Sequence, residues 1–296
     1  MTKQHILRLG ATVAGYILMV ATVYVLVLRL REQWPLIVAD LSRMRVLPAG
    51  GALLSTLALL LLMSTGWTLA LQAMGVSITM STGFSIYYQA DIFHYLPGGV
   101  WHLPGRAYLC QQRGISLTIF AQSVFFELFF LLGSGAILVG WGLAAYLSRP
   151  EFLALSVAAA VALGIVIVWP ERLLMLARRH AVPAGVIRRR ALFPMLLIYM
   201  MVWFTYGGAI MLLLNALPGM QTPPLLTVVI TNTTAWAAGY LSLSPAGMGV
   251  RELGLSIMLG ADLSAAAVVA SLTQRVMEIC LDGLLWVVAK LVARKN

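Results

Sequence analysis

The sequence predicts an all-α polytopic membrane protein, from its composition and from the spacing of its apolar stretches. Of the 296 residues, 61% are hydrophobic and 10% are charged, whereas a soluble globular domain carries about 25% charged residues. Several apolar stretches reach the roughly 20 residues that a membrane-spanning helix needs, and short charged or Gly- and Pro-rich breaks separate them. We therefore expect a single transmembrane domain over residues 1–296 and no soluble domain.

About six stretches are long enough to cross a bilayer. They are residues 9–28, 50–71, 114–147, 152–169, 192–214 and 264–293. The first follows two basic residues, as in a signal peptide, but it is too long for the apolar part of such a peptide and is interpreted as a retained span. Residues 114–147 and 152–169 are joined by a short turn, which predicts a helical hairpin. Residues 29–47 mix basic and apolar side chains and are expected to lie in the membrane interface.

We attribute the formal net charge of +10 to interactions with membrane lipids and not to binding of nucleic acid. Basic residues in short connections orient membrane spans and contact anionic head groups. Six arginines lie within residues 172–190, and basic residues also occur at both ends of the chain. This distribution predicts a multi-pass protein of the bacterial inner membrane with both termini in the cytosol, although it leaves the basic residues of 29–47 outside.

Two breaks rich in Pro and Gly interrupt the apolar sequence: LPGGVWHLPGRAY at 96–108 and SPAGMGVRE at 244–252. Each precedes a short apolar stretch and then a long helix that contains an acid. We expect each break to belong to a re-entrant helix pair, and the two pairs to form an inverted repeat with halves at about 50–147 and 192–293, as in many secondary transporters. The residues expected to break the backbone are Pro97, Gly98, Gly99, Pro104, Gly105, Pro245, Gly247 and Gly249.

Ionisable side chains at membrane depth are costly and mark candidate functional sites. We expect Arg106, Arg251 and Arg275 to bind a lipid phosphate, because a guanidinium group can hold a phosphate through two parallel hydrogen bonds and broken helix ends favour anions. The residues expected to balance this charge or to relay protons are Asp91, His94, Glu127, Glu252, Glu278 and Asp282. The alternative is that the charges only pair with one another and fix helix packing.

Helical spacing groups some of these residues. Tyr87, Asp91 and His94 share one helix face, which we expect to point toward Arg106. Arg275, Glu278 and Asp282 share a face of the last helix, where Arg275 is expected to neutralise a neighbouring acid. No further ligand spacing accompanies the histidines, so no metal is predicted, and the absence of nucleotide-binding and common catalytic motifs predicts no cofactor.

The stretch LSPAGMGVRELGLSIMLGADLSAAAVVASLTQRVMEI, residues 243–279, resembles the closing signature of the lysylphosphatidylglycerol synthase transmembrane (flippase-like) family. The matching positions are Pro245, Gly247, Gly249, Glu252 and Arg275. Residues 96–116 resemble the first signature of that family, although His94 and Tyr95 stand where an Asn is usual. The resemblance implies a multi-helix domain that moves lipids between leaflets, here as a stand-alone member without the aminoacyl-transferase domain.

We therefore expect a flippase- or scramblase-like transporter of an anionic phospholipid or a polyprenyl-phosphate-linked lipid, and not an enzyme. Two alternatives stay open. The protein could be an accessory subunit that binds a lipid or glycan synthesis enzyme, or a membrane-embedded enzyme that modifies lipid head groups with His94 or His102 as base. Membrane lipids are the expected partners in each case.

Overall fold

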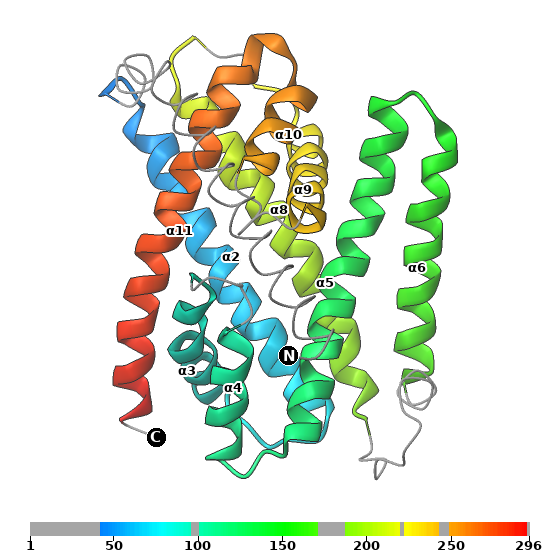
Figure 1. Ribbon diagram of the computed structural model, residues 1–296, viewed down its shortest axis with the longest axis vertical. Helices are drawn as coiled ribbons and strands as arrows, with labels where there is room; N and C mark the ends of the chain where they lie inside the picture. The colour runs from blue at the N-terminus through cyan, green and yellow to red at the C-terminus, as the bar shows by residue number, and fades with distance from the viewer. Residues whose placement is uncertain (1–41, 96–100, 171–186, 220–221, 243–248, 295–296) are drawn as a thin grey trace, which may run out of the picture.

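The computed structural model describes residues 42–95, 101–170, 187–219, 222–242 and 249–294, which form a bundle of α-helices without strands (Figure 1). The predicted all-α class is therefore confirmed. The α-helices are α2 (Val46–Ala73), α3 (Met80–Asp91), α4 (His102–Gln111), α5 (Leu117–Tyr146), α6 (Leu153–Val168), α8 (Leu192–Ala216), α9 (Leu225–Leu241), α10 (Val250–Leu259) and α11 (Ser264–Ala293). The short 3-10 helix η1 (Ile92–Tyr95) continues α3.

Four segments among the described residues are long and apolar enough to cross a membrane: α2, α5, Pro150–Val168 and Arg189–Ala216. They confirm four of the six predicted spans. The predicted span 9–28 lies outside the described residues. Helix α11 has the predicted bounds, but it is not among the four segments; it carries Gln274, Arg275, Glu278 and Asp282 in its middle. Most of its residues are nevertheless apolar, and several of them, such as Val276, Leu284 and Leu291, are exposed, so its crossing of the membrane stays a prediction.

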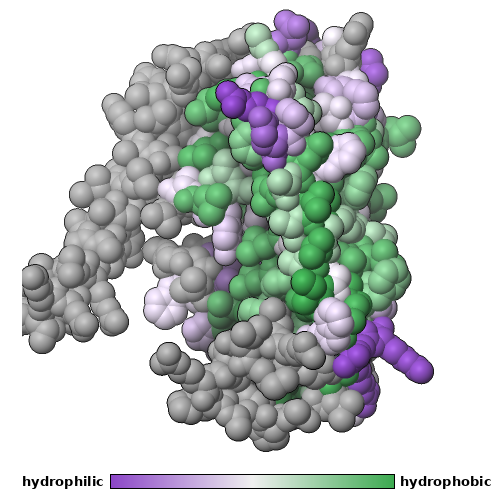
Figure 2. All heavy atoms as spheres, turned by 90° about the vertical axis from the view of Figure 1, so that its right-hand side faces the viewer, coloured by the Kyte–Doolittle hydropathy of each residue, from purple (hydrophilic) through white to green (hydrophobic). Residues whose placement is uncertain are grey.

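The lipid-facing character of the molecule is visible on the side of α5 and α6. Figure 2 shows a mainly hydrophobic surface between hydrophilic regions at the two ends of the described residues. On α6, Val157 and Val161 are exposed, and this helix packs mainly on α5. The predicted hairpin of α5 and α6 is thus confirmed, and the pattern of exposure is that of helices in lipid.

Helices α2 and α8 form the most extensive helix pair of the bundle and run in opposite directions (Figure 1). Glycine allows α9 to approach α8 closely. A Cβ atom built at Gly207 would lie 2.5 Å from the Cα atom of Val229 in α9, whereas one at the neighbouring Gly208 would meet only Ser55 Oγ at 3.6 Å. Gly207 therefore sets the spacing of α8 and α9.

Replacing Gly207 by alanine is expected to lower the thermal midpoint of the purified protein, because the new methyl group would overlap backbone and overpacking costs about 1–3 kcal/mol. Gly208→Ala is the matched control. It adds the same methyl group in the same helix without a clash and is expected to be neutral or stabilising, since alanine favours helix by about 1 kcal/mol over glycine. Equal midpoints for the two variants would contradict this assignment.

The order of elements occurs twice. In α2–α5 and in α8–α11, two helices lead to a short helix of 10 residues and then to a helix of 30 residues. The two sets run in opposite directions, with α3 and α4 toward one end of the bundle and α9 and α10 toward the other (Figure 1). Helix α5 of the first set packs on α9 of the second, and α11 of the second packs on α3 of the first. These contacts between the two sets of helices support the predicted inverted repeat.

Candidate functional site

The first group of charged residues is built by α3, η1 and α4. Thr79 caps α3, where its hydroxyl oxygen accepts a hydrogen bond from the amide of Thr82 at 3.2 Å. Asp91 is the last residue of α3 and His94 lies in η1. The predicted face of Tyr87, Asp91 and His94 is confirmed, because Tyr87 and Asp91 contact Arg106 and His94 contacts Asp91.

Arg106 lies in α4 and not in a backbone break, which corrects the prediction for Pro104 and Gly105. The helix begins at His102, and proline is tolerated in a first turn because the amide groups there lack intrahelical acceptors. Gly105 serves helix packing: a Cβ atom there would lie 3.1 Å from that of Ala90 in α3.

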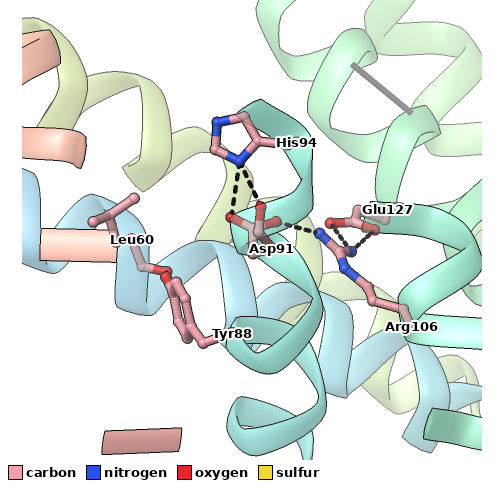
Figure 3. A network of polar contacts seen from close by, with 6 residues as sticks. All are labelled: Leu60, Tyr88, Asp91, His94, Arg106 and Glu127. Carbon is pink, nitrogen blue, oxygen red and sulfur yellow. Dashed lines mark hydrogen bonds and ion pairs between the residues drawn. The ribbon is translucent and has the colours of Figure 1, made fainter. Parts of the chain in front are cut away.

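The guanidinium group of Arg106 binds two carboxylates (Figure 3). Its Nη1 lies 3.1 Å from Oε2 of Glu127, on α5, and its Nη2 lies 3.1 Å from Oδ1 of Asp91. The group also stacks on the ring of Tyr87, with Cζ 3.6 Å from the centroid. Arg106 is 2% exposed. These contacts tie three helices together and already supply Arg106 with anionic partners, so its predicted role in binding lipid phosphate stays a prediction.

His94 and Asp282 extend this group toward α11. The Nδ1 atom of His94 lies 3.6 Å from Oδ2 of Asp91 and 2.8 Å from its backbone oxygen. Asp91, His94 and Asp282 each place one possible metal-ligand atom within 4.8 Å of the other two. The sequence pairs Asp91 with His94 by spacing, but nothing in it predicts that Asp282, almost two hundred residues away, joins them.

The second group lies at the start of α10. Gly249 has φ of 83°, a conformation that favours glycine, and it precedes the helix. Its amide donates to Oε2 of Glu252 at 2.7 Å, and Oε1 of Glu252 accepts from Nε of Arg275 at 2.7 Å. The residues predicted to lie in the break, Arg251 and Glu252, are therefore in the first helical turn. Arg275 pairs with Glu252 across two helices and not, as predicted, with an acid of its own helix.

Arg251 has a different environment from the other two arginines. It is 5% exposed, and its guanidinium carbon lies 4.5 Å from the ring centroid of Tyr206. Its Nε and Nη2 atoms are buried and make no hydrogen bond to any residue that the structure describes, and the same holds for the Nη2 atom of Arg275. No ion pair of Arg251 occurs among the described residues. Among the described residues, Arg106, Arg251 and Arg275 each carry a buried donor without an acceptor, and Arg251 is the one of the three without an ion pair.

Glu278, the remaining predicted acid, accepts a hydrogen bond from Nε2 of Gln274 at 3.4 Å, one turn earlier on α11. Sequence reasoning missed Gln274 and Tyr206. The first could have been found from its spacing of four residues to Glu278. The second could not, because Tyr206 belongs to an apolar span and meets Arg251 only through tertiary packing.

Five predicted break residues, Pro97, Gly98, Gly99, Pro245 and Gly247, lie outside the described residues, as does most of the basic connection 172–190. Of the predicted break residues that the structure describes, Gly249 is the one with a positive φ.

The family described as Lysylphosphatidylglycerol synthase TM region matches residues 13–281. The chain belongs to this family. The match covers nearly the whole transmembrane domain and both charged groups except Asp282, so it confirms the resemblance found in the two signatures and connects the protein with membrane lipids. None of the curated proteins compared with the chain matches it.

Proposed function

We propose that this member of the lysylphosphatidylglycerol synthase TM region family moves an anionic phospholipid or a polyprenyl-phosphate-linked lipid between leaflets, and that Arg251 binds the lipid phosphate. The observation that carries the proposal is the buried guanidinium group of Arg251, whose Nε and Nη2 donors have no acceptor among the described residues. Buried donors without acceptors are unfavourable, and a phosphate oxygen would supply the missing acceptors.

The surroundings of Arg251 suit a phosphate. Tyr206 covers one face of the guanidinium group, which leaves its edge for hydrogen bonds. Glu252 is already bound to Arg275 and to the amide of Gly249, so its charge is balanced locally. Arg275 has a second buried donor at Nη2, and two guanidinium groups together can hold a phosphate monoester or diester.

The proposal also includes the orientation in a bacterial inner membrane. The start of α8 and the end of α11 lie at the same end of the molecule (Figure 1). This end carries the exposed Arg188, Arg189 and Arg190 next to α8, and Lys290 and Arg294 on α11 and just after it. Such an accumulation of basic residues favours the cytosolic side, which agrees with cytosolic termini.

The test is lipid translocation in liposomes that contain purified protein and a fluorescent anionic phospholipid, with a membrane-impermeant quencher. Wild-type protein is expected to accelerate translocation. Arg251→Ala is expected to slow the protein-dependent rate by about 10- to 100-fold, because hydrogen bonds to charged groups contribute about 1.5–3 kcal/mol. Arg251→Lys keeps the charge but loses the planar fork, so an intermediate rate is expected.

Arg149→Ala is the matched control, since Arg149 is exposed in the turn between α5 and α6, and it is expected to keep the wild-type rate. Folding of each variant is checked by its elution from a sizing column. The proposal is wrong if neither a phospholipid nor a polyprenyl phosphate moves faster with wild-type protein, or if folded Arg251→Ala moves lipid at the wild-type rate.

A further inference from the structure

A second polar centre, distinct from the arginines of α10 and α11, joins the two halves of the bundle. Asp91 and His94 belong to α3 and η1, and Asp282 belongs to α11. One ligand atom from each residue lies within 4.8 Å of the other two. Asp282 is 3% exposed. The centre therefore places an imidazole and two carboxylates together at a contact between helices that are far apart in the sequence.

Among the residues that the structure describes, acids outnumber fixed cations in this region. Asp91, Glu127 and Asp282 bring three carboxylates, and Arg106 brings one fixed positive charge. The basic residues of α11 act elsewhere: Arg275 binds Glu252, and Lys290 lies over the ring of Trp286. Excess negative charge inside a membrane protein is costly unless protons or cations neutralise it. What points to a cation here is the geometry, in which two carboxylates and an imidazole bring one possible ligand atom each within 4.8 Å of the others.

The orientation of Asp91 fits a ligand role. Its Oδ1 atom accepts from Arg106 at 3.1 Å, whereas its Oδ2 atom faces Nδ1 of His94 at 3.6 Å (Figure 3). An arginine on one carboxylate oxygen fixes the plane of the group and directs the other oxygen, as outer partners commonly do at metal sites. Arg106 would then be a positioning residue for the carboxylate of Asp91.

We propose that Asp91, His94 and Asp282 bind a divalent first-row transition metal ion. Imidazole suits such ions, and carboxylates add the negative charge that manganese in particular prefers. Ligand atoms at about 2.1 Å from one ion lie about 3.0 Å apart at right angles and about 4.2 Å apart on opposite sides of it. The observed separations of 4.8 Å or less therefore need to close by no more than about 0.6 Å for an opposite pair and about 1.8 Å for a pair at right angles. The ion ties α3 and η1 to α11, and this proposal does not depend on lipid transport.

The test uses full-length protein purified in detergent, freed of metal with a chelator and titrated with Mn²⁺ alone or Co²⁺ alone. We expect one ion per chain, followed by loss of the free Mn²⁺ spin-resonance signal, and a higher thermal midpoint with metal. Asp282→Asn and His94→Gln are each expected to weaken binding at least about 10-fold. Asp262→Asn is the matched control, because Asp262 is an exposed acid in the turn between α10 and α11, and it is expected to bind as the wild type does.

Asp282→Cys gives a positive signal that does not depend on loss of binding. A thiolate ligand at position 282 is expected to add a sulfur-to-cobalt charge-transfer band that the wild-type complex lacks. The proposal is overturned if wild-type protein binds no stoichiometric metal, or if binding is unchanged in both Asp282→Asn and His94→Gln. If wild-type protein binds no metal and Asp282→Asn has a higher thermal midpoint than wild-type protein, the proposal is overturned. Protons, and not a metal ion, would then neutralise the carboxylates of this centre. None of these measurements involves lipid movement.

Discussion

Arg106→Ala is expected to destabilise the protein by about 3–5 kcal/mol, because removing one partner of a buried ion pair leaves the other charge without compensation. Here two acids are affected at once. Glu127 and Asp91 both bind the guanidinium group, and both come from other helices. The loss should appear as a thermal midpoint far below that of wild-type protein, or as failure to recover folded protein from the membrane.

Arg113→Ala is the control for this change, since Arg113 follows α4 and is exposed, and its midpoint is expected to stay at the wild-type value. The combined variant Asp91→Asn, Arg106→Met, Glu127→Gln removes all three charges together. It is expected to recover much of the lost stability, because isosteric neutral groups need no ionic partner. Equal stability of Arg106→Ala and Arg113→Ala would refute the buried network.

Glu252→Ala is expected to cause a loss of similar size, about 3–5 kcal/mol, for a related reason. The carboxylate of Glu252 is 2% exposed, and it accepts from Nε of Arg275 and from the amide of Gly249. Alanine would leave the half-buried Arg275 without its acid and would remove the acceptor that caps the first turn of α10. The thermal midpoint in detergent measures the loss.

A double-mutant cycle separates the ion pair from the cap. Arg275→Gln removes only the pair, and Glu252→Gln keeps an oxygen that can accept from Gly249. If Glu252 and Arg275 interact as described, the double variant loses less stability than the sum of the losses of the two single variants, since the effects of coupled neighbours are not additive. Glu151→Ala, at an exposed acid, is expected to have no effect. Additive losses would mean that the pair contributes nothing to stability.

The sequence predicts the helices well where local physics decides them. The bounds of α11 agree with the expected 264–293, because the length of this apolar stretch marks its ends in the sequence itself. The same local pattern placed Tyr87, Asp91 and His94 on one face. It failed at Pro104 and Gly105, because a proline within a first turn does not end a helix, and only the packing of α4 on α3 shows that the turn is helical.

The sequence by itself determined that this protein is an all-α membrane protein, which family it resembles, and which charged residues are candidates for a functional site. Tertiary structure alone decided how these charges are paired. In the tertiary structure, Arg106 binds two acids and Arg275 binds Glu252 of another helix. Arg251 packs against Tyr206 and forms no ion pair with the described residues. Asp282 lies beside Asp91 and His94. The physical reason is that helical periodicity fixes neighbours within one helix, whereas contacts between helices depend on how two distant segments pack.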